Sequence, residues 1–310
     1  MTDMKSSKTN SIDDLVGRIA DALASTTAPV VSTYELARQA FMLTPEPAAQ
    51  SPKKVYEELV GALLKARLLA PMDHMTTVKA YLLFGRSSAT PSEVVCSLDP
   101  FAYVSHLSAM EHHGLTDRFP KILYMTRPPA VEWRKQAAAR MEKDLGGRLL
   151  AYKETSLPRL VQPKISNVGH TVVQFYERSQ LGAFRLVAGS SLRVATIGRV
   201  FLDMLREPAL CGGIQHVIDI YQKEAKRYVN LITDEVDRHG QPIDKVRVGY
   251  ILSEVCEIET PVFEEWVKSA QRGGSRKLDP DGEYVSNYSA RWQLSINVPS
   301  LTRLTDGANE

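Results

Sequence analysis

Cysteine, long apolar runs and net charge are all scarce in this chain of 310 residues. Its three cysteines, Cys96, Cys211 and Cys256, are odd in number and far apart, so they suit a reducing cytoplasm and indicate neither disulfide bonds nor a metal site. The longest apolar runs, such as 81–84, are too short to cross a bilayer. We therefore expect a cytoplasmic protein with no membrane contact and no signal peptide.

The net charge of +2 at pH 7 is nearly balanced, so nucleic-acid binding would depend on local basic patches and not on the field of the whole protein. The length exceeds the usual size of one domain and predicts two. Apolar residues at 44% and charged residues at 24% are typical of a globular protein.

The sequence motifs of common enzymes are missing as well. The chain has no Gly-x-Ser-x-Gly elbow, no His-Glu-x-x-His zinc site, no Walker A loop and no Gly-x-Gly-x-x-Gly turn. Asp219 and Glu224-Ala-Lys226 resemble part of a metal-nuclease motif, but all of them lie on one predicted helix. The adjacent His112 and His113 lack a third ligand at a suitable spacing. We expect no enzyme activity, no cofactor and no metal.

Sequence spacing leaves some polar arrangements open. His112, Asp203, Arg247 and Glu254 could converge in three dimensions, and spacing cannot exclude it. Asp203 and Arg206 lie three residues apart on one predicted helix, which favours a local ion pair.

The first ninety residues show three helices followed by a hairpin. Apolar residues over 12–23 mark one face of the first helix, and Ser32 with Glu35 forms a capping box for the second. Ser51-Pro52 opens the third helix, and 77–84 has the pattern of a strand. This order predicts a winged helix-turn-helix DNA-binding domain over residues 1–90, with the third helix in the major groove.

Polar residues at the start of the third helix are the candidates for the DNA groove, namely Gln50, Ser51, Lys53, Lys54 and Tyr56. Candidates for the phosphate backbone are Arg38, Lys65, Lys79 and Arg86. The alternative is that the lysines only form a solvated helix face. Over the first ninety residues, ten Lys/Arg stand against nine Asp/Glu, so this domain has little charge of its own.

Residues 86–92 are rich in Ser, Thr and Pro and mark a linker, which places a larger mixed α/β domain at 91–310. Between Arg118 and Arg148 there are eight basic and three acidic residues, so Arg134 and Arg140 are further candidates for phosphate contact. A helix whose basic residues face water is again the alternative. The predicted fold class is α+β.

The larger domain has its own expected elements. Ser105 caps a short buried helix that stops at Gly114. Strands are predicted at 121–126, 171–175, 183–188, 192–195 and 292–298, and helices at 196–206, 214–237 and 244–256.

Several strings in this domain resemble one bacterial family. They are Ser105–Thr116, Phe201–Pro208 with Cys211-Gly-Gly213, Arg247–Leu252, Leu278–Pro280 and Arg291–Val298. Together, over about residues 98–299, they resemble the AbiEi-like antitoxin and transcriptional-regulator family of AbiE-type abortive-infection systems.

The resemblance implies a transcriptional autorepressor that binds double-stranded operator DNA with inverted repeats. It also implies an antitoxin that neutralises a nucleotidyltransferase-like toxin of a type IV toxin–antitoxin system in phage defence, without a stable complex. Two alternatives stay open. One is an enzyme-type antitoxin, an atypical kinase that modifies its toxin, although the chain shows no nucleotide-binding loop. The other is an interaction protein whose winged helix binds protein.

Overall fold

The computed structural model describes residues 3–44, 50–72, 79–271 and 276–301. It combines helices with antiparallel and mixed sheets, so the predicted α+β class is confirmed. The chain divides into two compact units, and each is built from segments that are distant in sequence. The first unit comprises 1–102, 127–179 and 186–193, and the second comprises 103–126, 180–185 and 194–310.

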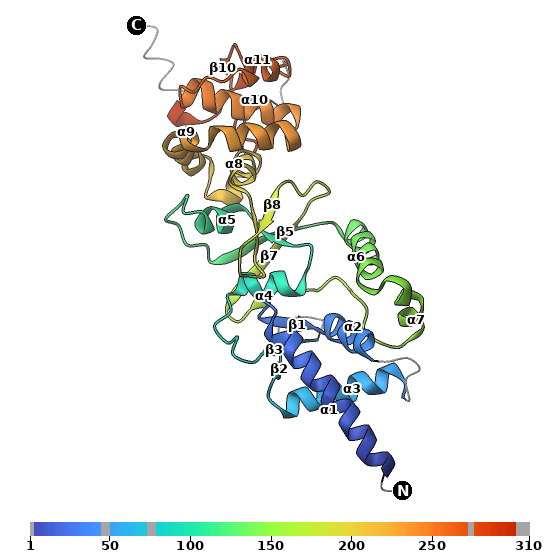
Figure 1. Cartoon of the computed structure of the whole chain (residues 1–310). Helices are drawn as coiled ribbons and strands as arrows, with labels where there is room; N and C mark the ends of the chain where they lie inside the picture. The colour runs from blue at the N-terminus through green and yellow to red at the C-terminus, as the bar shows by residue number, and fades with distance from the viewer. Residues whose placement is uncertain (1–2, 45–49, 73–78, 272–275, 302–310) are drawn as a thin grey trace. The chain divides into compact units, whose positions relative to one another are not determined.

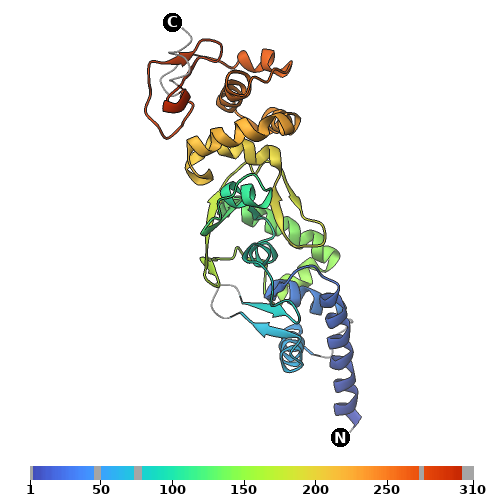
Figure 2. The ribbon, with the colours of Figure 1, turned by 90° about the vertical axis from the view of Figure 1, so that its left-hand side faces the viewer.

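The first unit begins with three helices and three short strands (Figure 1). These are α1 (Asp3–Ala24), β1 (Val30–Ser32), α2 (Thr33–Leu43), α3 (Pro52–Lys65), β2 (Leu69–Pro71) and β3 (Ala80–Leu83). The strands form an antiparallel sheet in the order β1-β3-β2. Figure 2 shows the β2–β3 pair beside α3, which it contacts through β2.

Local sequence signals account for these elements. The Ser32 hydroxyl accepts a hydrogen bond from the Glu35 amide at 3.2 Å, so the predicted cap of α2 is confirmed. Pro52 occupies the first turn of α3, also as predicted. The helix expected from about Ser11 begins earlier, at Asp3, since no proline or glycine interrupts the sequence before it.

One core cluster joins α1, α2, α3 and the sheet, and it contains the apolar faces that periodicity predicted. Its fully buried members include Ile19, Leu36, Leu59 and Leu63. Burying side chains of this kind stabilises the fold by roughly 1.5–3 kcal/mol each.

The rest of the first unit packs partly on the other face of α2 and partly on β1. Its elements are α4 (Pro91–Leu98), α6 (Ala130–Leu145), a 3-10 turn (Gly146–Arg148), α7 (Leu149–Glu154) and the antiparallel pair β6 (Asn167–Val168) and β7 (Thr171–Glu177). A second cluster brings Tyr34 and Phe41 of α2 against Met141, Leu145 and Tyr152. The 1–90 boundary stays a prediction, but α2 contributes to two cores inside this unit.

The second unit surrounds a small mixed sheet and a helical group. In it, β4 (Tyr103–Val104) pairs antiparallel with β5 (Ile122–Arg127) and parallel with β9 (Arg193–Ala195), which neighbours β8 (Phe184–Leu186). The helices are α5 (His106–His112), α8 (Ile197–Arg206), a 3-10 turn (Pro208–Cys211), α9 (Ile214–His239), α10 (Pro242–Tyr250), a π-helical turn (Ile251–Val255) and α11 (Val262–Val267). The strands β10 (Tyr288–Ser289) and β11 (Leu294–Ser295) form an antiparallel pair.

Two predicted elements of this unit differ from the structure. The strand expected at 292–298 is reduced to β11, because Gln293 has a left-handed backbone with φ of 48° inside a turn at 291–293, which interrupts the extended segment. The helix expected at 244–256 changes to π-helical geometry after Tyr250. Within the described ranges, no helix is both long and apolar enough to cross a membrane.

Candidate nucleic-acid interface

Helix α3 separates an apolar face from a charged one. Val55, Leu59 and Leu63 are buried in the first core cluster. The opposite face exposes Lys53, Lys54, Glu57, Glu58 and Lys65. Lys53 approaches Glu57 at 3.9 Å, with 59% and 62% of the two side chains exposed, so this pair adds little to stability. The charged face is therefore available to a ligand.

The N-terminal turn of α3 has an unusual charge for its position. A helix N-terminus favours anions, because its first amide groups lack partners within the helix. This turn contains no acidic residue, and the Ser51 hydroxyl makes no capping hydrogen bond. Lys53 and Lys54 instead place two positive charges there. Pro52 has no amide hydrogen, and the amides of Lys54 and Val55 donate to the Ser51 carbonyl, so this turn attracts phosphate through its two lysines and the positive end of the helix dipole.

The β2–β3 pair adds one more exposed cation. Lys79 directly precedes β3 and is exposed. In the part of the chain that the structure describes, Lys54, Lys65 and Lys79 have no acidic group within ion-pair distance. The tip of the predicted wing, residues 73–78, lies outside the described residues.

The predicted arginines mostly have partners inside the protein. The Arg38 guanidinium lies 2.6 Å from Glu35, and burial of both side chains is substantial. Arg140 Nε donates to Asp144 at 2.8 Å. Arg86 donates to the Thr26 carbonyl at 2.9 Å. These contacts give the three arginines partners inside the protein, and the first two are local helix pairs three and four residues apart.

Arg134 differs from those three because it is exposed on α6 and, within the described ranges, donates only to the Ala130 carbonyl of its own helix. The basic stretch from Arg118 to Arg148 that contains it is divided between the two units. It is therefore not one continuous basic surface within a single unit.

Two predicted groove residues are less exposed than the lysines. Tyr56 packs against both core clusters, and burial raises the pKa of its hydroxyl. Gln50 is half-buried, and its side-chain oxygen is buried with no hydrogen-bond partner among the described residues. Ser51, by contrast, is exposed.

A groove runs beside α3 and contains a cation that the sequence gave no reason to choose. Its volume is about 530 Å³, and its walls include Tyr56, Glu57, Lys79, Tyr81 and Arg159. Arg159 is exposed and donates to the Lys153 carbonyl at 3.0 Å. No local pattern marks it, because only the fold of α7 and the following loop brings residue 159 next to α3.

The second unit contains a buried polar network at the start of α5. His106 Nδ1 lies 2.9 Å from the Ser105 hydroxyl, and its Nε2 lies 3.0 Å from the Glu207 carboxylate. Thr126 donates to the same Ser105 hydroxyl at 2.8 Å. His106 has a left-handed backbone with φ of 49°, a conformation that costs about 1–3 kcal/mol and persists only where its surroundings fix it.

This network fixes the start of α5 and is not open to substrate. Ser105 is fully buried and His106 is 1% exposed. Ser105 is the N-cap residue of α5, as predicted, but its hydroxyl is used by Thr126 and His106 instead of by the helix. His113 also has a partner, the Ala195 carbonyl at 2.7 Å.

The four polar residues whose convergence was open have separate neighbours, and His112 lies edge-on against the His113 ring. Asp203 pairs with Arg199, Arg247 donates to the Lys277 carbonyl and Glu254 accepts from Ser289. The predicted Asp203–Arg206 pair is wrong, because Arg206 instead reaches Asp244 at 2.6 Å. Among the described residues, no three His, Cys, Asp or Glu side chains lie close enough to hold a metal ion.

Comparison of the chain with protein-family models gives no match, and comparison with curated proteins gives none either.

Proposed function

We propose that this protein is a DNA-binding transcriptional autorepressor and antitoxin of a type IV toxin–antitoxin system that acts in the cytoplasm. In this proposal, α3 enters the major groove of an operator with inverted repeats. The nucleotidyltransferase-like toxin is a functional partner that forms no stable complex with it.

The first turn of α3 is the observation that supports DNA binding most directly. Lys53 and Lys54 stand where a helix dipole disfavours cations, and no acidic residue offsets them in that turn. The two lysines therefore destabilise α3 slightly, and such destabilising charges are expected where they bind a ligand. In this proposal, DNA phosphates contact the two lysines at the positive end of the helix dipole.

The arrangement of the N-terminal elements supports the same proposal. Three helices followed by an antiparallel β2–β3 pair is the arrangement of a winged helix-turn-helix, in which the last helix reads base edges. Lys79 and Arg159 flank α3 across the neighbouring groove, and we propose that they contact the phosphate backbone.

The antitoxin role rests on the strings that resemble the AbiEi-like family. Residues 200–205 of α8 are buried, as are Cys211 and most of α10. These strings are thus core residues, and they support a shared fold of the second unit more than a shared contact surface.

Fluorescence anisotropy tests DNA binding. The full-length protein is titrated into its own upstream DNA and into a scrambled duplex over a series of salt concentrations. Tight, selective binding with a steep dependence on salt is expected. Equal weak binding to both duplexes would refute the repressor role. Growth rescue from the adjacent toxin tests the antitoxin role separately, and no rescue by expressed, folded protein would refute it.

A further inference from the structure

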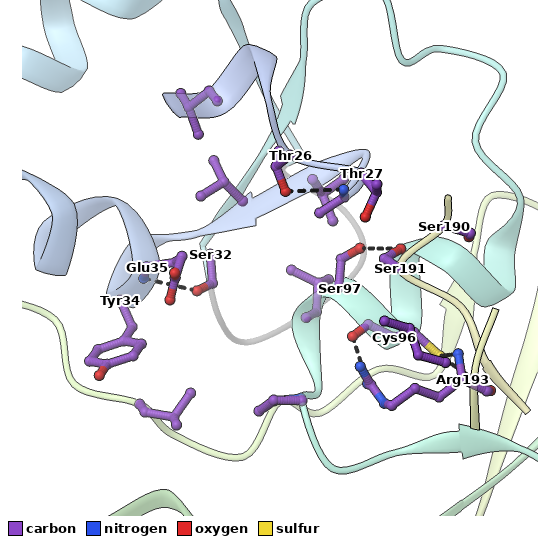
Figure 3. A pocket seen from close by; sticks show the side chains of 18 of the residues that line it. Thr26, Thr27, Ser32, Tyr34, Glu35, Cys96, Ser97, Ser190, Ser191 and Arg193 are labelled. Atoms are coloured by element: carbon purple, nitrogen blue, oxygen red, sulfur yellow. Dashed lines mark hydrogen bonds between the residues drawn. The ribbon is translucent and has the colours of Figure 1, made fainter. Parts of the chain in front are cut away.

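A cavity of about 250 Å³ lies within the first unit, away from the charged face of α3. Figure 3 shows Thr26 and Ser32 beside β1 on one side, with Ser97 of α4 and Ser191 of the turn before β9 on the other. If a water molecule takes about 30 Å³, the cavity has room for about eight of them. A ligand with roughly ten non-hydrogen atoms would fill it.

The hydroxyl groups around the cavity are held in place. Ser97 donates to the Glu93 carbonyl at 2.7 Å and lies 3.0 Å from the Ser191 hydroxyl. Ser32 accepts from the Glu35 amide. The Ser97 proton is already used, but both hydroxyls keep a lone pair and Ser32 makes no donor contact within the described residues, so a polar ligand finds both acceptors and a donor here.

The charged groups at the cavity already have partners. Glu35 lies 2.6 Å from Arg38, and Arg140 lies 2.8 Å from Asp144. Arg193 donates to backbone carbonyls at the end of α4. An ionic ligand would have to disrupt one of these pairs to be neutralised, so the cavity favours an uncharged ligand.

One acceptor on the wall has no partner. The side-chain oxygen of Gln39, on α2, is buried and makes no hydrogen bond within the described part of the chain. This oxygen has almost no accessible surface, so the side-chain amide must turn toward the cavity before a ligand N–H group can reach it. That contact would remove the cost of a buried acceptor without a donor. Apolar side chains of Leu98, Leu160 and Leu186 also line the cavity and suit the face of a flat ring.

We infer that this cavity binds a free, uncharged nucleobase. A nucleobase combines N–H donors and ring acceptors at its edge with an apolar face, and proteins recognise extruded bases by this combination of hydrogen bonds and apolar packing. Its roughly ten ring and substituent atoms match the size of the cavity. Phosphate would find no unpaired cation on the wall, so a nucleotide is disfavoured.

Isothermal titration calorimetry of the full-length protein with adenine, hypoxanthine, cytosine and uracil tests this inference. At least one base is expected to bind at one site per chain, with adenosine 5′-monophosphate binding at least tenfold more weakly than its base. Gln39→Leu should weaken binding about tenfold through loss of the amide acceptor. Gln222→Leu, on an exposed face of α9, is the matched control and should bind as the wild type does.

Thr27→Phe provides a second variant, because Thr27 is exposed at the cavity and a larger side chain there should fill its mouth without disturbing the core. It should abolish binding. The inference is overturned if no base binds, if Gln39→Leu and Thr27→Phe bind as the wild type does, or if the nucleotide binds more tightly than the base. The assay contains no DNA, so its failure would leave the proposed repressor role untouched.

Discussion

The double variant Lys53→Ala/Lys54→Ala separates the function of α3 from its stability. It should lower the affinity for DNA without lowering the free energy of unfolding. Both lysines are exposed, and the 3.9 Å contact of Lys53 with Glu57 is too weakly held to matter for folding. Removing two cations from a helix N-terminus and replacing them by alanine should leave the free energy of unfolding unchanged or raise it by up to about 1 kcal/mol.

DNA affinity should fall in the same variant. Each lysine–phosphate contact contributes about 0.9 to the slope of log affinity against log salt concentration, so the slope should flatten by about 1.8. We take wild type and variant to have equal affinity at about 1 M salt, where the lysine–phosphate contacts contribute nothing. The difference in slope then corresponds to a roughly thirtyfold loss of affinity at about 0.15 M salt. Operator anisotropy over a salt series measures both quantities, and a thermal melt measures stability.

A matched control is Lys223→Ala/Lys226→Ala, which removes two exposed lysines from α9 in the second unit. Its slope should equal that of the wild type. If the α3 variant keeps the wild-type slope and affinity, or if both variants lose affinity equally, the assignment of α3 to the DNA groove is wrong.

Three further predictions concern the second unit. Arg199 and Asp203 approach to 2.8 Å while almost wholly buried, so Arg199→Met should cost about 3–5 kcal/mol in urea unfolding, and adding Asp203→Leu should recover most of it. Burial lowers the pKa of His113, so this imidazole binds a proton more readily in the unfolded chain than in the folded one. Stability should therefore fall as the pH drops through about 6.5. In thermal melts from pH 7 to 5, His113→Asn should flatten that dependence. Gly249→Ala should lower the melting temperature, through overpacking of about 1–3 kcal/mol or more, because the added methyl group would collide with the Trp292 ring; an unchanged melt would contradict that packing.

Elements with local signals were the predictable part of this fold. Ser32 and Pro52 at the starts of α2 and α3, and Thr196 at the start of α8, act within one helical turn, so the sequence is enough to place them. The strand expected at 292–298 is short because Gln293 has a left-handed backbone conformation, which the alternation of apolar and polar residues does not reveal. Ser295 is buried and its hydroxyl reaches the Val285 carbonyl at 2.8 Å.

The candidate interface was predictable only where a side chain is exposed on its own helix. Lys53 and Lys54 are such residues, and the structure leaves them on the surface. Arg38 and Arg140 are also basic residues on helices, but their acidic neighbours and the packing of α2 with α6 determine their contacts. Arg159 shows the reverse case, because an unremarkable residue comes next to α3 through the path of the chain after α7.

Helix α2 packs on two sides within the first unit, and composition alone does not show this. A helix that is apolar on more than one face is expected to be buried on more than one side. Leu36 and Ala40 enter the first core cluster, while Tyr34 and Phe41 enter the second with α6 and α7. Tyr56 of α3 packs against both clusters. The orientation of α3 therefore depends on side chains more than seventy residues further along the chain, and a fragment cut near residue 90 would lose the packing that fixes it.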